Sequence, residues 1–302
     1  MTEQESITIA LEDKICRLDK FLSEKFNTQS RAYFQYLIDT GFVLVNSKKI
    51  KKSFIPSVGD DIEIFFQAVE MCDLKPQNIP LEILYEDENI LAINKPKGMV
   101  VHPAAGNWEN TFVNALLYHC KDLINFEDKI RPGIVHRLDK DTTGVIIAAK
   151  TTKAHQRLIV QFQNREIIKK YLAICVNKPD NQIINAPIKR HPIKRKEMAV
   201  IDSGKEASTK IETLAYNDKL SLVQASPKTG RTHQIRVHLK HINTPILGDE
   251  TYGSKSLNKK FNIYTHLLHA YSIEFMHPIT NEKMKIVANI PDEFKKFIHK
   301  IS

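Results

Sequence analysis

The chain has 302 residues, of which 42% are hydrophobic and 26% charged, the balance of a folded globular protein with room for more than one domain. It contains no apolar run long enough to span a bilayer, its acidic N-terminus lacks the apolar core of a secretion signal, and its four cysteines form no CxxC pair. We therefore expect a cytoplasmic protein with no membrane partner, no disulfide framework and no zinc knot.

Charge is distributed unevenly along the chain. The net charge is +9, yet residues 1–70 hold 9 Lys and Arg against 11 Asp and Glu. The positive excess therefore lies in the remainder of the chain. Clustered Lys and Arg favour polyanions, because phosphates release counterions when they are neutralised. A polyanion partner is the functional interpretation, and a merely lysine-rich composition is the alternative.

Residues 17–66 have the pattern of a small separate unit. Thr28 or Ser30 can cap the second of two helices, and Gly41 can end it. A basic cluster of four lysines, Lys48, Lys49, Lys51 and Lys52, follows before a turn. The predicted elements of this unit are, in chain order, helices at 18–26 and 34–38 and strands at 43–45 and 61–66.

This unit resembles the S4 RNA-binding domain. The similarity rests on RLDKFLSEKF…SRAYFQYLIDTGFVLVNSKKIKKSF…VGDDIEI, and we place the domain at residues 14–67. In that family a helix pair and the following turn present basic residues to RNA, and one basic face is enough even when the total charge is negative. The alternative for the lysine cluster is a solvated run. The matching RNA-contact positions are Arg31, Lys48, Lys49 and Lys51.

The rest of the chain predicts a larger α+β domain at residues 81–302. Residues 68–80 contain two prolines and few apolar residues, which predicts a linker. Strand patterns then outnumber helical ones and do not alternate strictly with long helices, so we expect a mixed, mostly antiparallel sheet rather than a doubly wound parallel one. The predicted strands lie at 81–85, 90–94, 145–149, 171–176, 209–214, 220–225 and 272–275, and the helices at 111–119, 152–164, 232–242 and 292–301.

The most informative segment is 131–150, RPGIVHRLDKDTTGVIIAAK. It places a carboxylate, Asp139, beside His136 and Arg137 and just before an uninterrupted apolar run. Such charged groups beside a buried strand more often belong to a functional site than to an ordinary surface. The alternative is a solvated turn. A nearby arginine favours an ionised carboxylate. Asp139 could then act as nucleophile, general base or electrostatic partner, and the residues alone do not choose among these.

Two further basic segments stand out. In KTGRTHQIRVHL (228–239), Thr232 can cap a helix whose first turns carry His233 and Arg236, which would make a phosphate site. An ordinary basic helix is the alternative. In NKPKGMVVHPAAGN (94–107), Lys95 lies in what is by itself only a basic loop.

Several common chemistries lack their motifs. The sequence has no GxGxxG, no P-loop and no HExxH. HRLD differs from a kinase catalytic loop, in which Asp directly follows Arg. Two histidine pairs have a three-residue spacing that can bind metal, but no third ligand is suitably spaced, so we expect no metal site.

Taken together, these segments resemble the RluA family of pseudouridine synthases over nearly all of residues 81–277. The matching segments are NKPKGMVVHPAAGN, RPGIVHRLDKDTTGVIIAAKT, KKYLAICV, PIKRHPIKRKEMAV, GKEAST, TGRTHQIRVHL and GDETYG. The resemblance implies isomerisation of uridine to pseudouridine in RNA, by glycosidic cleavage, base rotation and re-attachment through C5, without a cofactor. VVHPAAGN, PIKRHPIKRKEMAV and the S4 unit point within the family to enzymes that act on 23S rRNA, in large-subunit particles.

The resemblance also implies residue roles. Asp139 is the catalytic aspartate, Tyr171 in KKYLA the active-site tyrosine, and Arg236 in HQIR the basic partner of the aspartate. Arg137 is implied to help flip or replace the target base. Further residues expected to contact substrate or RNA are His136, Lys95, His233 and Arg231.

Two other functions remain open at this point. One is a non-catalytic rRNA-binding ribosome-assembly factor on the same fold, which would not need the aspartate, tyrosine and arginine together. The other is a different glycosidic-bond enzyme, which usually needs a second carboxylate, and Asp141 is the nearby candidate. Nothing in the sequence indicates an obligate interface, so we expect a monomer, and the sequence does not specify which uridines are modified.

Overall fold

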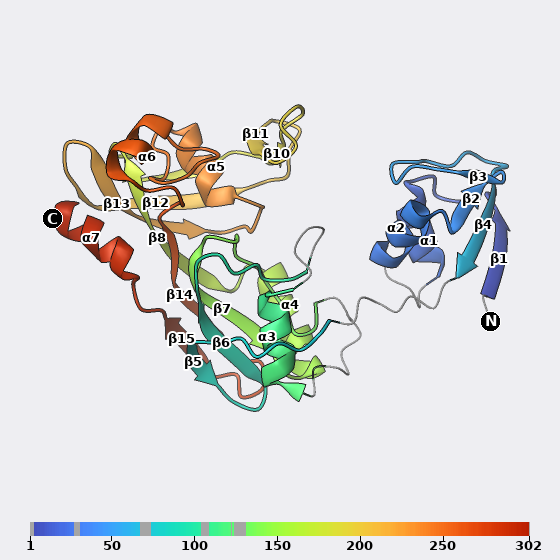
Figure 1. Ribbon diagram of the computed structural model, residues 1–302, viewed down its shortest axis with the longest axis horizontal. Helices are drawn as coiled ribbons and strands as arrows, with labels where there is room; N and C mark the ends of the chain where they lie inside the picture. Colours follow the sequence, from blue (N-terminus) through green and yellow to red (C-terminus); the bar gives the residue numbers. More distant parts are fainter. Residues whose placement is uncertain are drawn as a thin grey trace. The chain divides into compact units, whose positions relative to one another are not determined.

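The computed structural model describes residues 3–26, 31–66, 74–103, 109–121, 123 and 131–301. The chain forms two compact units, Met1–Asp73 and Leu74–Ser302, each of which is described by itself (Figure 1). Among the described residues no helix has both the length and the hydrophobicity needed to cross a membrane. The predicted caps Thr28 and Ser30 lie outside the described residues.

The first unit packs two helices on a four-stranded antiparallel sheet of order β1-β4-β2-β3. Its elements are β1 (Glu3–Thr8), α1 (Leu18–Lys25), α2 (Arg31–Thr40), β2 (Val43–Val45), β3 (Lys48–Lys49) and β4 (Asp61–Phe66). The helical apolar positions and those of the strands meet in one core, which includes Leu22, Phe34 and Ile62, each essentially inaccessible to solvent. Gly41 ends α2 with φ +80°, as the sequence predicts.

The second unit contains a nine-stranded sheet in which, among the described strands, only β7 and β14 pair in parallel. The predicted mixed, mostly antiparallel sheet is thus confirmed. The path runs β5 (Ile83–Glu86), β6 (Ile90–Lys95), β7 (Thr143–Ala149), β14 (Leu268–Met276), β8 (Ile168–Val176), β13 (Leu220–Pro227), β12 (Ser208–Tyr216) and β9 (Gln182–Asn185), and β15 (Lys283–Val287) pairs with β14. A separate hairpin joins β10 (Ile188–Arg190) to β11 (Met198–Val200).

Helices cover both faces of the β6–β7 half of this sheet. One set of alternating residues, including Leu91 and Ile146, packs against α3 (Phe112–His119). The other set, including Ala92 and Ile147, packs against α4 (Thr152–Gln163). A strand buried on both faces needs no polar alternation, which accounts for the uninterrupted apolar run before Lys150.

The other half of the sheet carries three helices. α5 (Gln234–His241), α6 (Lys255–Phe261) and α7 (Asp292–Ile301) pack on β8 and β13 (Figure 1). The α7 side chains Phe294 and Phe297 are almost fully buried there. Fully burying such side chains contributes about 2 kcal/mol each, so this half has a core of its own.

Part of the predicted linker packs against the second unit. Leu74 and Ile79 contact the cluster under α3, and the Gln77 N–H donates to the Asn114 carbonyl at 3.0 Å. The apolar side chains within this proline-containing stretch explain why it is held. Residues 68–73 lie outside the described part of the chain.

Gly144 allows β7 to approach β14. Its φ is +107°, and a Cβ atom there would lie 2.2 Å from the carbonyl oxygen of Ala270. Only glycine fits this conformation and this approach. The segment immediately before β7, which contains Asp139, is thereby held beside the start of β14.

Candidate active site

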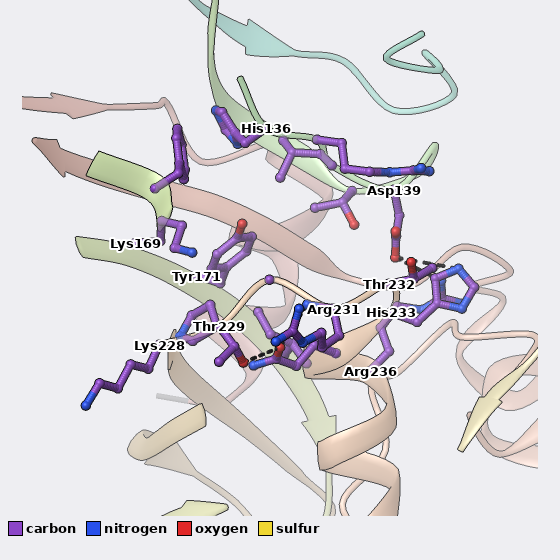
Figure 2. A pocket seen from close by; sticks show the side chains of 18 of the residues that line it. His136, Asp139, Lys169, Tyr171, Lys228, Thr229, Arg231, Thr232, His233 and Arg236 are labelled. Atoms are coloured by element: carbon purple, nitrogen blue, oxygen red, sulfur yellow. Dashed lines mark hydrogen bonds and ion pairs between the residues drawn. The ribbon is translucent and has the colours of Figure 1, made fainter. Parts of the chain in front are cut away.

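A pocket of about 470 Å³ opens where the loop before β7, strand β8 and the start of α5 meet (Figure 2). Asp139 is the one carboxylate among its described lining residues. The lining also contains six Lys or Arg side chains, namely Arg137, Arg165, Lys169, Lys228, Arg231 and Arg236. Such a lining attracts an anionic ligand while it presents a single carboxylate to it.

Asp139 is held by an arginine that is itself anchored. Nη1 of Arg236 lies 3.1 Å from Oδ2 of Asp139. The other edge of the guanidinium binds Asp249 through two bonds, Nε to Oδ2 at 2.7 Å and Nη2 to Oδ1 at 3.0 Å. The Asp249 side chain is fully buried, and that of Asp139 is 18% exposed. Asp249 therefore fixes the guanidinium, which leaves one edge for the carboxylate that faces the pocket.

These contacts determine the charge state of the arginine. Burial alone would lower the pKa of Arg236, but the carboxylates of Asp249 and Asp139 outweigh it and raise the pKa above its ordinary value. Burial alone would raise the pKa of Asp249, but the hydrogen bonds and charge of Arg236 lower it overall. The arginine thus stays protonated beside Asp139 at neutral pH.

The start of α5 differs from the sequence prediction. Thr232 is exposed and does not cap the helix, which begins after His233 in the left-handed conformation (φ +56°). The side chain of Gln234 holds the preceding turn instead, because its oxygen accepts from the Thr229 hydroxyl at 2.7 Å and from the Arg231 N–H at 3.0 Å. This turn aims Arg236 at Asp139 rather than at an external phosphate.

The loop that carries Asp139 and the start of β7 are also held by two histidines, His266 just before β14 and His269 within it. His266 Nε2 lies 2.9 Å from Oγ1 of Thr142, and His269 Nδ1 lies 2.8 Å from Oγ1 of Thr143. Burial lowers the pKa of both rings to about 4, so they are neutral. This pair, whose spacing is compatible with metal binding, therefore uses these nitrogens to fix the loop.

Lys95, predicted to contact RNA, has a different position. Its side chain is completely buried, and Nζ donates to the carbonyls of Pro96, Met99 and Lys140 at 2.8 to 3.0 Å. The RNA-contact prediction is corrected here, because no surface of this side chain is open to a ligand. Burial lowers its pKa to about 8, partly offset by the charges of Asp141 and Asp139. The ammonium holds the residue that follows Asp139.

Tyr171 forms one wall of the pocket. It lies on β8, between Ala225 of β13 and Ala270 of β14, and its side chain projects into the pocket (Figure 2). Burial, and to a lesser extent the charge of Asp139, raises the pKa of its hydroxyl, which is therefore protonated at neutral pH. Lys169 lies beside it in the same view, and burial lowers the pKa of its ammonium.

His136 also lines the pocket. Its Nε2 accepts a hydrogen bond from the Ile147 N–H at 3.0 Å, and its ring stacks on Phe162 with centroids 4.9 Å apart. Burial lowers its pKa to about 3, so the ring is neutral. His136 is thus tied to β7 and supplies an aromatic surface.

The structure brings most of the predicted site residues together. Asp139, Tyr171 and Arg236 line one pocket, with four other predicted residues beside them, namely Arg137, His136, His233 and Arg231. The four remaining predicted RNA contacts belong to the first unit. There Nε of Arg31 donates to the buried Asp19 at 2.9 Å, and three lysines are exposed, namely Lys48, Lys49 and Lys51.

Comparison with known proteins identifies the family. The sequence model for RNA pseudouridylate synthase matches residues 89–241, and that for the S4 domain matches residues 16–62. A protein of Aquifex aeolicus, named an uncharacterised RNA pseudouridine synthase, is 41% identical over 98% of this chain and 96% of its own. The chain belongs to the RNA pseudouridine synthases.

Further relatives agree with this assignment. A Yersinia pestis protein named ribosomal large subunit pseudouridine synthase D is 40% identical over 98% of this chain and 94% of its own. The solved structure of human RNA pseudouridylate synthase domain containing 4 is 28% identical, with a TM-score of 0.58 over 73% of this chain and 92% of that one. The family, the S4 domain and the isomerase class predicted from the motifs are confirmed.

The site of this pseudouridine synthase also contains residues that sequence reasoning did not single out. Asp249 anchors Arg236, and the hydroxyl of Tyr252 lies 2.8 Å from Nδ1 of His233. Both belong to the GDETYG segment, which carries part of the resemblance but received no role. Its Gly248 has φ +82° and approaches Thr265, a sign that this turn is constrained.

One group of possible metal ligands lies outside the pocket. Among the described residues, only Glu86, His119 and Cys120 bring three such atoms within 4.8 Å of one another. The Lys150 ammonium already lies 2.7 Å from the Glu86 carboxylate. This cation competes for the position that a metal ion would take.

Proposed function

We propose that this pseudouridine synthase isomerises uridines in the RNA of the large ribosomal subunit, with Asp139 as its catalytic carboxylate. The observation that carries the proposal is the single carboxylate among the described residues of the pocket lining, fixed by an anchored Arg236. The rRNA target is supported by relatives of about 40% identity whose names state that activity. We also propose that the protein acts in the cytoplasm as a monomer.

The reaction needs only groups that this pocket contains. The bond from N1 of uracil to C1′ of the ribose breaks, the base turns, and a bond from C5 to C1′ forms. C5 loses a proton and N1 ends with one, so no atom or electron is gained or lost and no cofactor is required. An ionised carboxylate can assist by bonding to the sugar, by bonding to the base, or by stabilising positive charge as the bond breaks. We propose this role for Asp139.

Tyr171 is the proposed group beside the turning base. Its hydroxyl is protonated in the free protein, partly because the negative charge of Asp139 raises its pKa. If Asp139 forms a bond to the substrate, that charge disappears and the phenol becomes more acidic. Tyr171 would then give its own proton to N1 more readily, and the phenolate so formed would accept the proton that C5 loses.

The uridine has to leave its stack to reach Asp139. Arg137 is exposed at the pocket, where it can occupy the vacated position. The other cations of the lining would bind the flanking phosphates, with help from the S4 unit. Of the residues predicted to contact RNA, His136 would contact the base rather than a phosphate, because its ring is neutral.

The decisive experiment replaces Asp139 and compares it with its neighbour. Asp139→Asn should abolish pseudouridine formation in 23S rRNA transcripts or large-subunit particles, with RNA affinity within about threefold of wild type because the shape of the side chain is kept. Asp141→Asn is the matched control, since Asp141 does not line the pocket, and it should remain active. Isomerisation by the Asp139→Asn enzyme would end the proposal.

The same assay separates enzyme from assembly factor. A wild-type protein that binds large-subunit rRNA but forms no pseudouridine would support the non-catalytic alternative. Mapping pseudouridines in ribosomal RNA from cells with and without the gene would identify the target. Loss of sites only outside the large subunit would contradict the rRNA part of the proposal.

A further inference from the structure

Tyr252 lies between the β10–β11 hairpin and the start of α5. Its side chain is 3% exposed and belongs to a small apolar cluster shared by these two elements. Its hydroxyl oxygen accepts from the Met198 N–H of β11 at 2.7 Å and lies 2.8 Å from Nδ1 of His233. Its ring face lies 5.0 Å from the guanidinium carbon of Arg236. Tyr252 thus contacts the hairpin and two residues of the pocket.

The number of available hydrogens shows which group donates in the hydrogen bond between Tyr252 and His233. A phenol oxygen can accept from a backbone N–H and has one hydrogen of its own to give. Burial raises the pKa of Tyr252, so that hydrogen is present at neutral pH. Nδ1 of His233 is the acceptor within reach. Were Nδ1 protonated, two donors would meet at the oxygen, and the phenol hydrogen would have no acceptor among the hydrogen bonds of the described residues.

The other ring nitrogen therefore carries the hydrogen of His233. Burial lowers the pKa of His233, although the charge of Asp139 partly opposes this, so the ring is neutral. A neutral imidazole that accepts at Nδ1 donates at Nε2. Nε2 lies 4.0 Å from Oδ2 of Asp139, on the side that faces the pocket (Figure 2).

We propose that Tyr252 is a positioning residue that fixes His233 in the tautomer with its hydrogen on Nε2, so that a neutral N–H donor faces Asp139 and the substrate. The inference rests on the proposed role of Asp139. The Nε2–H group of His233 would be a second hydrogen-bond donor beside Asp139, in addition to Arg236, and it would add no charge to the pocket. Tyr252 also ties that donor to the hairpin, whose exposed basic side chains are Lys189, Arg190, Lys194, Arg195 and Lys196.

The tautomer can be read directly on the free protein. Nitrogen-15 NMR spectra of the imidazole side chains distinguish protonated from unprotonated ring nitrogens, and His233→Gln assigns the signals by their loss. At pH 7.5 we expect His233 to be neutral with its proton on Nε2. A proton on Nδ1, or on both nitrogens, overturns the proposal.

Tyr252→Phe isolates the hydroxyl. The ring and its packing remain, so RNA affinity should stay within about twofold, while His233 should show both tautomers and kcat should fall about tenfold. Tyr216→Phe is the matched control, because Tyr216 is 56% exposed on β12 and does not line the pocket. An unchanged tautomer, an unchanged kcat, or an equal loss in Tyr216→Phe overturns the proposal.

A pair of substitutions at His233 tests the donor itself. Gln and Leu have the same Cβ and thus meet the same strain at φ +56°, but only the Gln amide can donate near the position of Nε2. We expect His233→Gln to be about tenfold more active than His233→Leu at equal thermal stability, and equal activity overturns the proposal. Activity in Asp139→Asn would end the proposed function, whereas the tautomer measurement would remain valid.

Discussion

At the scale of single residues, the site depends on how one guanidinium divides its hydrogen-bond donors between two carboxylates. Arg236 gives a bidentate edge to the buried Asp249 and one remaining donor to Asp139. The planar fork of arginine permits this division, which a lysine ammonium could not reproduce. Asp249 thus positions Arg236, and its Oδ1 also accepts from the Tyr252 N–H at 3.0 Å.

The Asp249–Arg236 pair leads to a prediction about stability and pH. Asp249→Asn should lower the free energy of unfolding by roughly 3 kcal/mol at pH 7, because it leaves a buried guanidinium partly unpaired. The folded pKa of Asp249 lies below the ordinary value of 3.8. The stabilisation is thus complete above that value and is lost as the pH falls through the folded pKa. Urea denaturation at several pH values measures this difference.

The control for this prediction is Asp202→Asn, because Asp202 is exposed. It should change stability by less than about 0.5 kcal/mol at any pH. The wild-type and Asp249→Asn curves should converge in strong acid. A difference that persisted unchanged there would show that the loss comes from packing rather than from the charge of Asp249.

Some contacts of the site could not be predicted from the sequence, for a physical reason. Asp139 and Arg236 lie 97 residues apart and meet only because β7, β14 and β8 are neighbours in the sheet. The sequence predicted their partnership through the resemblance alone. A basic loop likewise gives no sign that Lys95 is buried, since its three acceptors are backbone carbonyls.

At the scale of elements, segments with a regular apolar pattern were predicted correctly from the sequence, whereas several short strands were not. The apolar runs of β6 and β7 and the helical spacing of α3 and α4 predicted elements that the structure contains. Helix α6 and the strands β1, β3, β9, β10, β11 and β15 were not predicted. The strands are short or largely polar and gain their order from neighbouring strands, which a local pattern does not reveal. The error at Thr232 has a similar origin, because the Gln234 amide that holds the turn is itself fixed by the distant Ser208 carbonyl, to which Nε2 donates at 3.0 Å.

The parallel contact of β7 with β14 gives a prediction at this scale. Gly144→Ala should destabilise the second unit by about 3 kcal/mol or more, because a Cβ atom would meet the Ala270 carbonyl at 2.2 Å in a left-handed backbone. Gly98→Ala is the matched control, since its φ is +84° and its Cβ would meet nothing within 4 Å. It should cost about 1 kcal/mol. Thermal unfolding of both variants measures the difference, and equal losses would show that backbone strain alone matters.

At the scale of the whole molecule, both units have cations available for RNA, although their net charges differ. Among the residues that the structure describes, the pocket lining of the second unit contains six Lys or Arg side chains and one carboxylate. In the first unit, Lys20, Lys25 and Lys52 are paired with carboxylates. The three exposed lysines at and after β3, Lys48, Lys49 and Lys51, form no ion pair with the described residues. Phosphate binding by the first unit should therefore depend on Lys48, Lys49 and Lys51 rather than on the three paired lysines.

These two groups of lysines permit a matched test of the S4 unit. Replacing Lys48, Lys49 and Lys51 by Gln should weaken RNA binding and reduce the dependence of log Kd on log salt by roughly two to three, because each lysine that contacts a phosphate releases about one counterion. The same change at Lys20, Lys25 and Lys52 removes equal charge and should have a smaller effect. Turnover at saturating RNA should stay near wild type in both triple variants, since Asp139 and its partners lie in the other unit. Equal salt dependences in the two variants would mean that total charge, rather than this group of lysines, governs the contribution of the S4 unit.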